Sequence, residues 1–176
     1  VIKNTFNPQG TGTVIVREQE RAEGVIKAVT MHKDVGIVNL KGVGMAEIPD
    51  IPGRLFTTLG DNNISPLMIS GSLESNLSFV IKKEFLNDVV GLLNENFVDN
   101  GIRELELIED VCIVAVVGVG MHGTKGLAAK IFKTVADEDA NIIMIAQGSS
   151  EVNISFMVNE EDGSRVVKAL HKTFIE

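Results

Sequence analysis

The stretch that decides the fold is Val111–Ser150, VCIVAVVGVGMHGTKGLAAKIFKTVADEDANIIMIAQGSS. An apolar run leads into a glycine-rich turn, a segment of helical periodicity follows, and a second apolar run leaves it, which predicts strand, loop, helix and strand. The pattern occurs twice. When Val35–Met45 is laid on Val111–Met121 without a gap, seven of the eleven residues are identical. The similarity continues through the following helix and hairpin, so the chain contains an internal duplication.

Copy one follows the order βαββαβ, and copy two repeats it as far as the second helix. For copy one the sequence predicts strands at 35–41, 64–70, 76–82 and 102–108, and helices at 50–61 and 85–97. For copy two it predicts strands at 111–117, 142–146 and 152–158, and helices at about 125–137 and 162–174.

Copy two has no counterpart of the last strand of copy one, because the corresponding strand of copy two would begin beyond Glu176. A sheet without it would have an unpaired edge and an uncovered core face. The apolar run Val25–Met31 belongs to neither copy and can fill the gap. We therefore expect copy one to be inserted within copy two. The expected domains are 32–110 for the first and 25–31 plus 111–176 for the second, with 1–24 as a lead-in.

Composition narrows the class of protein. The 176 residues are 44% hydrophobic, and the longest apolar run, Val111–Val117, is too short to cross a bilayer. The net charge of -8 disfavours a nucleic-acid or anionic-membrane surface. A single cysteine, Cys112, forbids an intrachain disulfide and is compatible with the cytoplasm.

The loop Gly118–Gly123 has the spacing G-x-G-x-x-G, which is typical of dinucleotide sites. Such a site needs an acidic residue at the end of the next strand, where this chain has Ala146 and Gln147. Copy one has Glu47 in place of the third glycine. These departures disfavour a nucleotide cofactor, and we expect no cofactor.

The glycine loop could still bind a small ligand. Free N–H groups at a helix start attract a carboxylate, and glycines let a small ligand approach the main chain. The polar segment Ala146–Glu151 could supply an amide and hydroxyls to the same ligand. Tight turns that pack helix on sheet would explain the same residues, and spacing alone does not separate the two interpretations. The three histidines are scattered, so we expect neither a metal site nor a catalytic centre.

The tandem V-x-I-V-x(3)-G-V-G-M, the segment Ala146–Val158 (AQGSSEVNISFMV) and the final ALHKTF resemble the regulatory region of aspartate kinase. The lead-in Lys3–Pro8 with Gly12–Ile15 resembles the segment that joins its kinase domain to its paired ACT domains. The resemblance implies an α+β fold of two ferredoxin-like βαββαβ ACT domains, the first inserted into the second, with antiparallel sheets and helices on one face. It also implies that this chain lacks the kinase domain, which phosphorylates the β-carboxylate of aspartate with ATP, and is not itself catalytic.

The resemblance further implies that an end-product amino acid binds between ACT domains and inhibits the kinase. Threonine is the first choice of effector and lysine the second, because the motif A-Q-G-S-S-E-x-N-I-S is most like that of threonine-sensitive members. Carried over by motif, the effector contacts would be Met45, Ala46, Glu47, Ile48, Asp50, Ile51, Ser65, Pro66 and Leu67 in copy one, and Met121, His122, Gly123, Thr124, Gly126, Asn141, Ile142 and Gln147 in copy two. Copy one departs from the pattern at Gly71, near a position where many members carry glutamine.

We also expect a homodimer or a higher oligomer, formed through exposed sheet edges. The alternatives are an architectural dimerisation module without a ligand and a nucleotide-binding enzyme built on the glycine loop.

Overall fold

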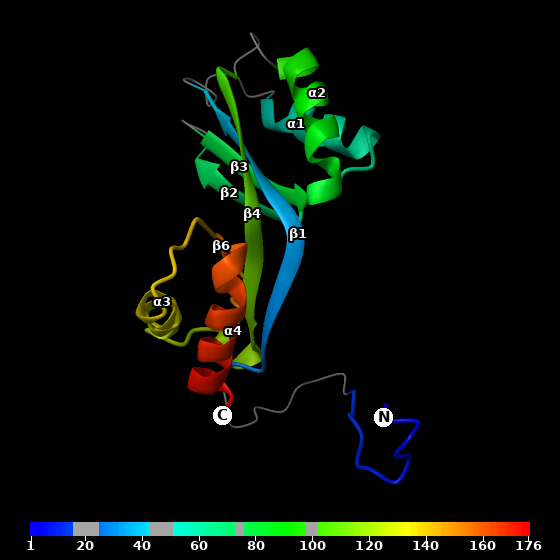
Figure 1. Cartoon of the computed structure of the whole chain (residues 1–176), viewed down its shortest axis with the longest axis vertical. Helices are drawn as coiled ribbons and strands as arrows, with labels where there is room; N and C mark the ends of the chain where they lie inside the picture. Colours follow the sequence, from blue (N-terminus) through cyan, green and yellow to red (C-terminus); the bar gives the residue numbers. More distant parts are fainter. Residues whose placement is uncertain (16–24, 43–50, 73–75, 98–101) are drawn as a thin grey trace.

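The computed structural model of the chain describes residues 1–15, 25–42, 51–72, 76–97 and 102–176. Its centre is an antiparallel six-stranded sheet in the order β2-β3-β1-β4-β6-β5 (Figure 1). The elements are β1 (Ala28–Lys41), α1 (Ile51–Asp61), β2 (Met68–Ser72), β3 (Asn76–Lys82), η2 (Lys83–Phe85), α2 (Leu86–Phe97), β4 (Glu104–Val117), η3 (Val119–Met121), α3 (Leu127–Asp137), β5 (Met144–Ala146), β6 (Asn153–Asn159) and α4 (Glu160–Phe174).

Two long strands, β1 and β4, run through both halves of the molecule (Figure 1). The first part of β1, Ala28–His32, pairs with residues 113–117 of copy two, and the remainder pairs with β3 and with residues 104–108. The strand expected at Val25–Met31 therefore lies in the sheet of copy two, from Ala28 onward. This pairing confirms that copy one is inserted within copy two.

Each half repeats the ferredoxin-like strand order. In copy one the order is β2, β3, the end of β1 and the start of β4; in copy two it is β5, β6, the end of β4 and the start of β1. The strand β1 is therefore central in copy one and outermost in copy two, and β4 is central in copy two and outermost in copy one. The halves form one hydrogen-bonded sheet because these two strands are shared.

The helices of each half cover one face of its part of the sheet (Figure 1). Residues of α1 and α2 form a core with β1 and β3 that includes Leu55, Leu93 and Phe79. Residues of α3 and α4 form the corresponding core of copy two, where the rings of Phe132 and Phe156 meet edge to face at 5.9 Å. Their alternating apolar residues bury these faces by the hydrophobic effect.

The helix-free faces of the two halves pack against each other. Their shared cluster consists of Val35, Ile37, Met68, Val80, Val111, Met144 and Met157, which come from all six strands. The matched methionines Met68 and Met144 lie in this cluster and fill its irregular space.

Several predicted strands begin later than expected. The strands predicted from Val25 and Ile102 begin at Ala28 and Glu104. The strands predicted from Ile64 and Ile142 begin at Met68 and Met144. Ile64 instead donates its N–H to Leu59 at the end of α1, at 2.9 Å, and Pro66 has no N–H to donate to a strand ladder. Across the ranges that the structure describes, no helix has both the length and the apolar character that crossing a membrane requires.

Candidate functional site

The glycine loop of copy two connects β4 to α3. Gly118 is buried against the backbone of Val25 and Ile26. A Cβ at this position would overlap the carbonyl of Val25 and the Cα of Ile26. Gly123 and Gly126 adopt left-handed φ angles of 69° and 78°. Apart from their own chain neighbours, no atom of the residues that the structure describes lies within 4 Å of the place where their Cβ would be. Gly118 therefore serves packing, whereas Gly123 and Gly126 leave open space beside the backbone.

Hydrogen bonds within the loop hold its shape. Met121 is buried, and its carbonyl accepts the N–H of Thr124 at 3.0 Å. The Thr124 hydroxyl donates to the carbonyl of Gly120 at 2.8 Å. His122, Gly123 and Thr124 are exposed around this anchored core. The loop is thus a preformed main-chain surface that faces solvent.

The start of α3 has no side-chain cap. Gly126 occupies the N-cap position, and no acidic residue lies in the first turn. The first N–H groups of a helix have no partner within the helix and carry partial positive charge. Together with the open space at Gly123 and Gly126, they make this end of copy two suitable for a carboxylate.

One carboxylate of the protein already reaches the loop. Glu151 accepts a hydrogen bond from the Gly123 N–H at 2.7 Å. Its own backbone is left-handed, with φ of 52°, in a turn where its N–H bonds to the carbonyl of Gly148 at 3.0 Å. Glu151 was not among the expected contacts. The available signal was the duplication, because Glu74 occupies the matching position of copy one, although it lies outside the described residues.

The structure brings some of the expected contacts to one end of the sheet and places others elsewhere. Val117 of β4 pairs with Asn153, and Ala146 of β5 pairs with Ser155, so β4 and β5 both end beside the start of β6. Gln147 therefore lies at the same end as the glycine loop. Asn141 and Ile142 precede β5 at its other end. At about 3.3 Å per extended residue, Asn141 is up to roughly 20 Å of chain from Gln147.

The expected contacts of copy one are only partly described. Ile51 is fully buried in the core of copy one, so its side chain faces the sheet. Ser65 and Leu67 are exposed and Pro66 is half-buried ahead of β2. Met45, Ala46, Glu47, Ile48 and Asp50 lie outside the described residues.

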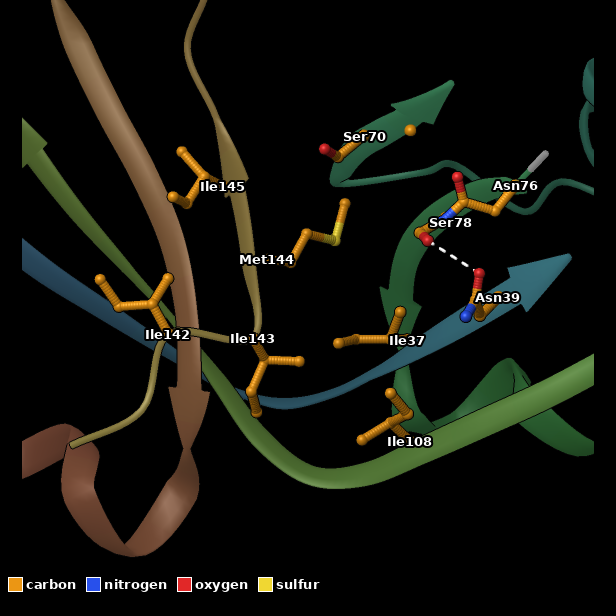
Figure 2. A pocket seen from close by; sticks show the side chains of 11 residues that line it. Ile37, Asn39, Ser70, Asn76, Ser78, Ile108, Ile142, Ile143, Met144 and Ile145 are labelled. Carbon is orange, nitrogen blue, oxygen red and sulfur yellow. Dashed lines mark hydrogen bonds between the residues drawn. The ribbon is translucent and has the colours of Figure 1, made fainter. Parts of the chain in front are cut away.

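A separate hollow of about 350 Å³ lies between the helix-free faces of the two halves (Figure 2). Ile37, Ile108 and residues 142–145 line its apolar part, and Asn39, Ser70, Asn76 and Ser78 line its polar part. Among the described residues that line it, none carries a charge. A free amino acid would bring two charges into this hollow without an ionic partner, which is costly. This hollow therefore suits an amino acid less well than the glycine loop does.

The polar part of the hollow is occupied by hydrogen bonds between strands. Ser78 donates to Asn39 at 3.0 Å, as Figure 2 shows, and Asn39 donates to Glu106 at 3.2 Å. Lys41 pairs with Glu106 at 2.8 Å. The hydrogen bonds from Lys41 and Asn39 hold the pKa of Glu106 below its usual value. This carboxylate is therefore engaged in joining β1 to β4.

The loop does not form a dinucleotide site. Such sites lie between adjacent parallel strands, whereas β6 separates β4 from β5 and pairs antiparallel with both. The residue after β5 is the neutral Gln147. The G-x-G-x-x-G spacing here serves packing at Gly118 and an open main chain at Gly123.

Comparisons with known proteins agree with this architecture. A family model described as ACT domain matches residues 38–97 and 114–174. The chain is 32% identical, over 99% of its length, to a chloroplastic bifunctional aspartokinase/homoserine dehydrogenase 1 of Arabidopsis thaliana, of which it covers 20%. The chain thus spans about a fifth of the length of this curated relative.

Solved structures show the same fold. The ligand-free regulatory subunit of aspartate kinase from Thermus thermophilus is 29% identical with a TM-score of 0.74, covering 86% of this chain and 99% of that one. Aspartate kinase from Clostridium acetobutylicum is 26% identical with a TM-score of 0.88, covering 98% of this chain and 40% of that one. The family match spans both copies, and the chain belongs to the ACT domain family.

Proposed function

We propose that this chain is the regulatory part of an aspartokinase and that it binds a free amino acid as an allosteric effector. The observation that carries the proposal is the exposed glycine loop at the uncapped start of α3, with open space beside Gly123 and Gly126. The similarity to a regulatory subunit of aspartate kinase along 86% of the chain supports it.

The loop matches the chemistry of a zwitterion. The effector's carboxylate would accept hydrogen bonds from the main-chain N–H of Gly123 and from those in the first turn of α3, where the helix dipole also favours negative charge. Its side chain would be read by neutral polar groups, of which the exposed Gln147 at the same sheet end is the best placed. An amide can donate to and accept from a hydroxyl, so we favour threonine, with lysine second.

A second chain would complete the site. β5 is an edge strand, and its Ile145 is 43% exposed. If two β5 strands paired antiparallel, the start of one would lie beside the end of the other. Asn141 and Ile142 of one chain would then approach the glycine loop and Gln147 of the other. This arrangement unites the effector contacts that a single chain keeps apart, and it supports a homodimer.

Inhibition would follow from the shared site. An effector held between two chains favours the dimer geometry that binds it best, and a kinase domain attached at the lead-in, residues 1–24, would respond to that geometry. The proposed units are 32–110 for the first ACT domain and 25–31 plus 111–176 for the second. A cytoplasmic enzyme of amino-acid biosynthesis is consistent with this role.

Calorimetric titration with threonine, lysine and methionine tests the proposal. We expect saturable heat with threonine, and a loss of affinity of about tenfold in Gln147→Ala, the effect of one lost hydrogen bond to a charged or polar ligand. Gln9→Ala, an exposed change in the lead-in, is the matched control and should bind as wild type. If none of the three amino acids gives heat or raises the melting temperature, the effector role is wrong.

A dimer that no amino acid stabilises would instead favour the architectural alternative. Stabilisation by NAD or ATP would favour the nucleotide-binding alternative, which the antiparallel pairing around the loop already opposes.

A further inference from the structure

The contact between Glu151 and the glycine loop bears on how the proposed effector binds. The Glu151 carboxylate accepts the Gly123 N–H at 2.7 Å. It is the kind of group that the loop is proposed to bind, and it occupies an N–H that an effector's carboxylate would need. We propose that Glu151 is an internal competitor of the effector, so that its carboxylate sets the affinity of the site. This inference rests on the proposed function.

The geometry of the two loops supports competition. Gly123 is exposed, with a left-handed φ of 69° and open space where a side chain would be, so a ligand can approach the backbone beside Glu151. Glu151 extends from the turn that begins at Gly148, whereas its neighbour Val152 is fixed by the Gly118 N–H at 2.9 Å. The Glu151 side chain can therefore leave Gly123 while the end of the turn stays in place.

Charge explains why the two carboxylates exclude each other. An N–H···carboxylate bond is charge-assisted and stronger than a neutral one. Two carboxylates sharing the same N–H groups would also repel at close range. The effector must therefore displace Glu151, and part of its binding energy is used to break the existing bond. This competition would keep the site empty at low effector concentration and let it respond only when the end product accumulates.

The test combines a ligand-free measurement with a titration. Glu151→Gln removes the charge and keeps the size of the side chain. Glu151→Gly removes the side chain and suits the left-handed backbone. We expect the amide resonance of Gly123 to shift in both variants without ligand, and threonine to bind about tenfold more tightly than to wild type, the fold-change of one charge-assisted hydrogen bond. Glu161→Gln, at an exposed position of α4, changes the net charge equally and should alter neither reading.

The outcomes separate this inference from the proposed function. If threonine binds wild type but binds the Glu151 variants equally or more weakly, competition is wrong and the effector role stands; weaker binding would make Glu151 a ligand of the ammonium group. If the variants bind threonine more tightly than wild type does, both proposals are supported. If the Gly123 resonance shifts but no protein binds any of the three amino acids, the proposed function fails and the competition falls with it. An unshifted Gly123 resonance contradicts the contact itself.

Discussion

The Cys112 side chain of β4 fills the space in which a side chain at Gly163 of α4 would lie: its Sγ is 2.5 Å from the position of a Cβ there. At the matching place of copy one the sizes are exchanged. Gly36 takes the strand position and Leu86 the helix position, and a Cβ on Gly36 would lie 2.6 Å from a Leu86 methyl group. Each copy thus packs a glycine against a larger residue where its second helix crosses its first strand. The glycine lies on the strand in copy one and on the helix in copy two.

This exchange predicts that Gly163→Ala destabilises the protein. Glycine to alanine within a helix normally stabilises by about 1 kcal/mol. Here the added methyl group would meet Cys112 and also Met31, whose Sδ is 2.8 Å away. Overpacking of a core costs about 1–3 kcal/mol, which exceeds that gain, so we expect a net loss of about 1 kcal/mol in the free energy of unfolding, measured by urea denaturation.

Gly91→Ala provides the matched control. Gly91 lies in α2, and a Cβ there meets no atom within 4 Å. This variant should gain stability by about 0.5–1 kcal/mol. The double variant Cys112→Ala with Gly163→Ala should recover part of the loss, because the two changes are coupled through one contact. Additive effects would show that the two residues do not compete for space.

The left-handed backbone of Asp34 leads to a second prediction. Asp34 and Asp110 occupy matched positions where the long strands pass from one half to the other, with φ of 57° and 56°. Pairing between β1 and β4 shifts register in this region. Alanine tolerates this backbone less well than aspartate, so Asp34→Ala should cost about 1 kcal/mol of unfolding free energy.

Asp34→Gly separates backbone conformation from the lost side chain. Glycine adopts left-handed φ freely, so this variant should lie within about 0.5 kcal/mol of wild type. Glu95→Ala, at an exposed position of α2, controls for the lost charge. If Asp34→Gly lost as much stability as Asp34→Ala, the side chain and not the φ angle would be what the position requires.

The thiol of Cys112 gives a prediction about pH. Burial raises its pKa, and the nearby Glu160 raises it further. A group whose pKa is raised by folding stabilises the protein fully below its unfolded pKa, and that stability is lost as the pH rises through the folded value. We therefore expect stability to fall above about pH 9, the ordinary value of 9.0, and to fall less in Cys112→Ser.

Alkylation checks the same thiol directly. Cys112 is the single cysteine of the chain, so the mass added by iodoacetamide reports on it alone. We expect very slow labelling of the folded protein at neutral pH and rapid labelling in urea. Rapid labelling of the folded protein would contradict the burial of this side chain.

Much of the fold was predictable because the two copies inform each other. The strand Asn76–Lys82 has the expected bounds, since the alternation of its first four residues and the apolar run that follows them are visible in the sequence. Insertion of one copy in the other followed from a strand that copy two lacks. That two pairs of predicted strands would merge into β1 and β4 did not follow. Lys33 and Asp34 look like turn residues in the sequence. In the structure β1 continues through them, with a left-handed φ at Asp34 and a shift in the pairing register with β4.

The site was less predictable, because it depends on how loops from different segments meet. The glycine spacing indicates an open backbone at Gly123, yet the same spacing at Gly118 serves close packing with Val25. The sequence alone does not distinguish these roles. The bond from Gly123 to Glu151 joins residues of two loops, and side-chain contacts of this kind have no periodic signal.

The sheet edges lead to the last prediction. Ile145 of β5 and Ile69 of β2 are matched residues on the two edge strands, 43% and 46% exposed. A charge on an edge strand opposes pairing with another chain. Ile145→Lys should therefore dissociate dimers that pair through β5 and weaken threonine binding with them, whereas Ile69→Lys should do so only if β2 forms the interface.

Sedimentation velocity measures the assembly of the chains, and calorimetry measures the binding of threonine. Ile175→Lys, at a 38% exposed position just after α4, is the control for added charge. If both edge variants remained dimeric, the chains would associate through another surface, and the completion of the site by a second β5 would be wrong.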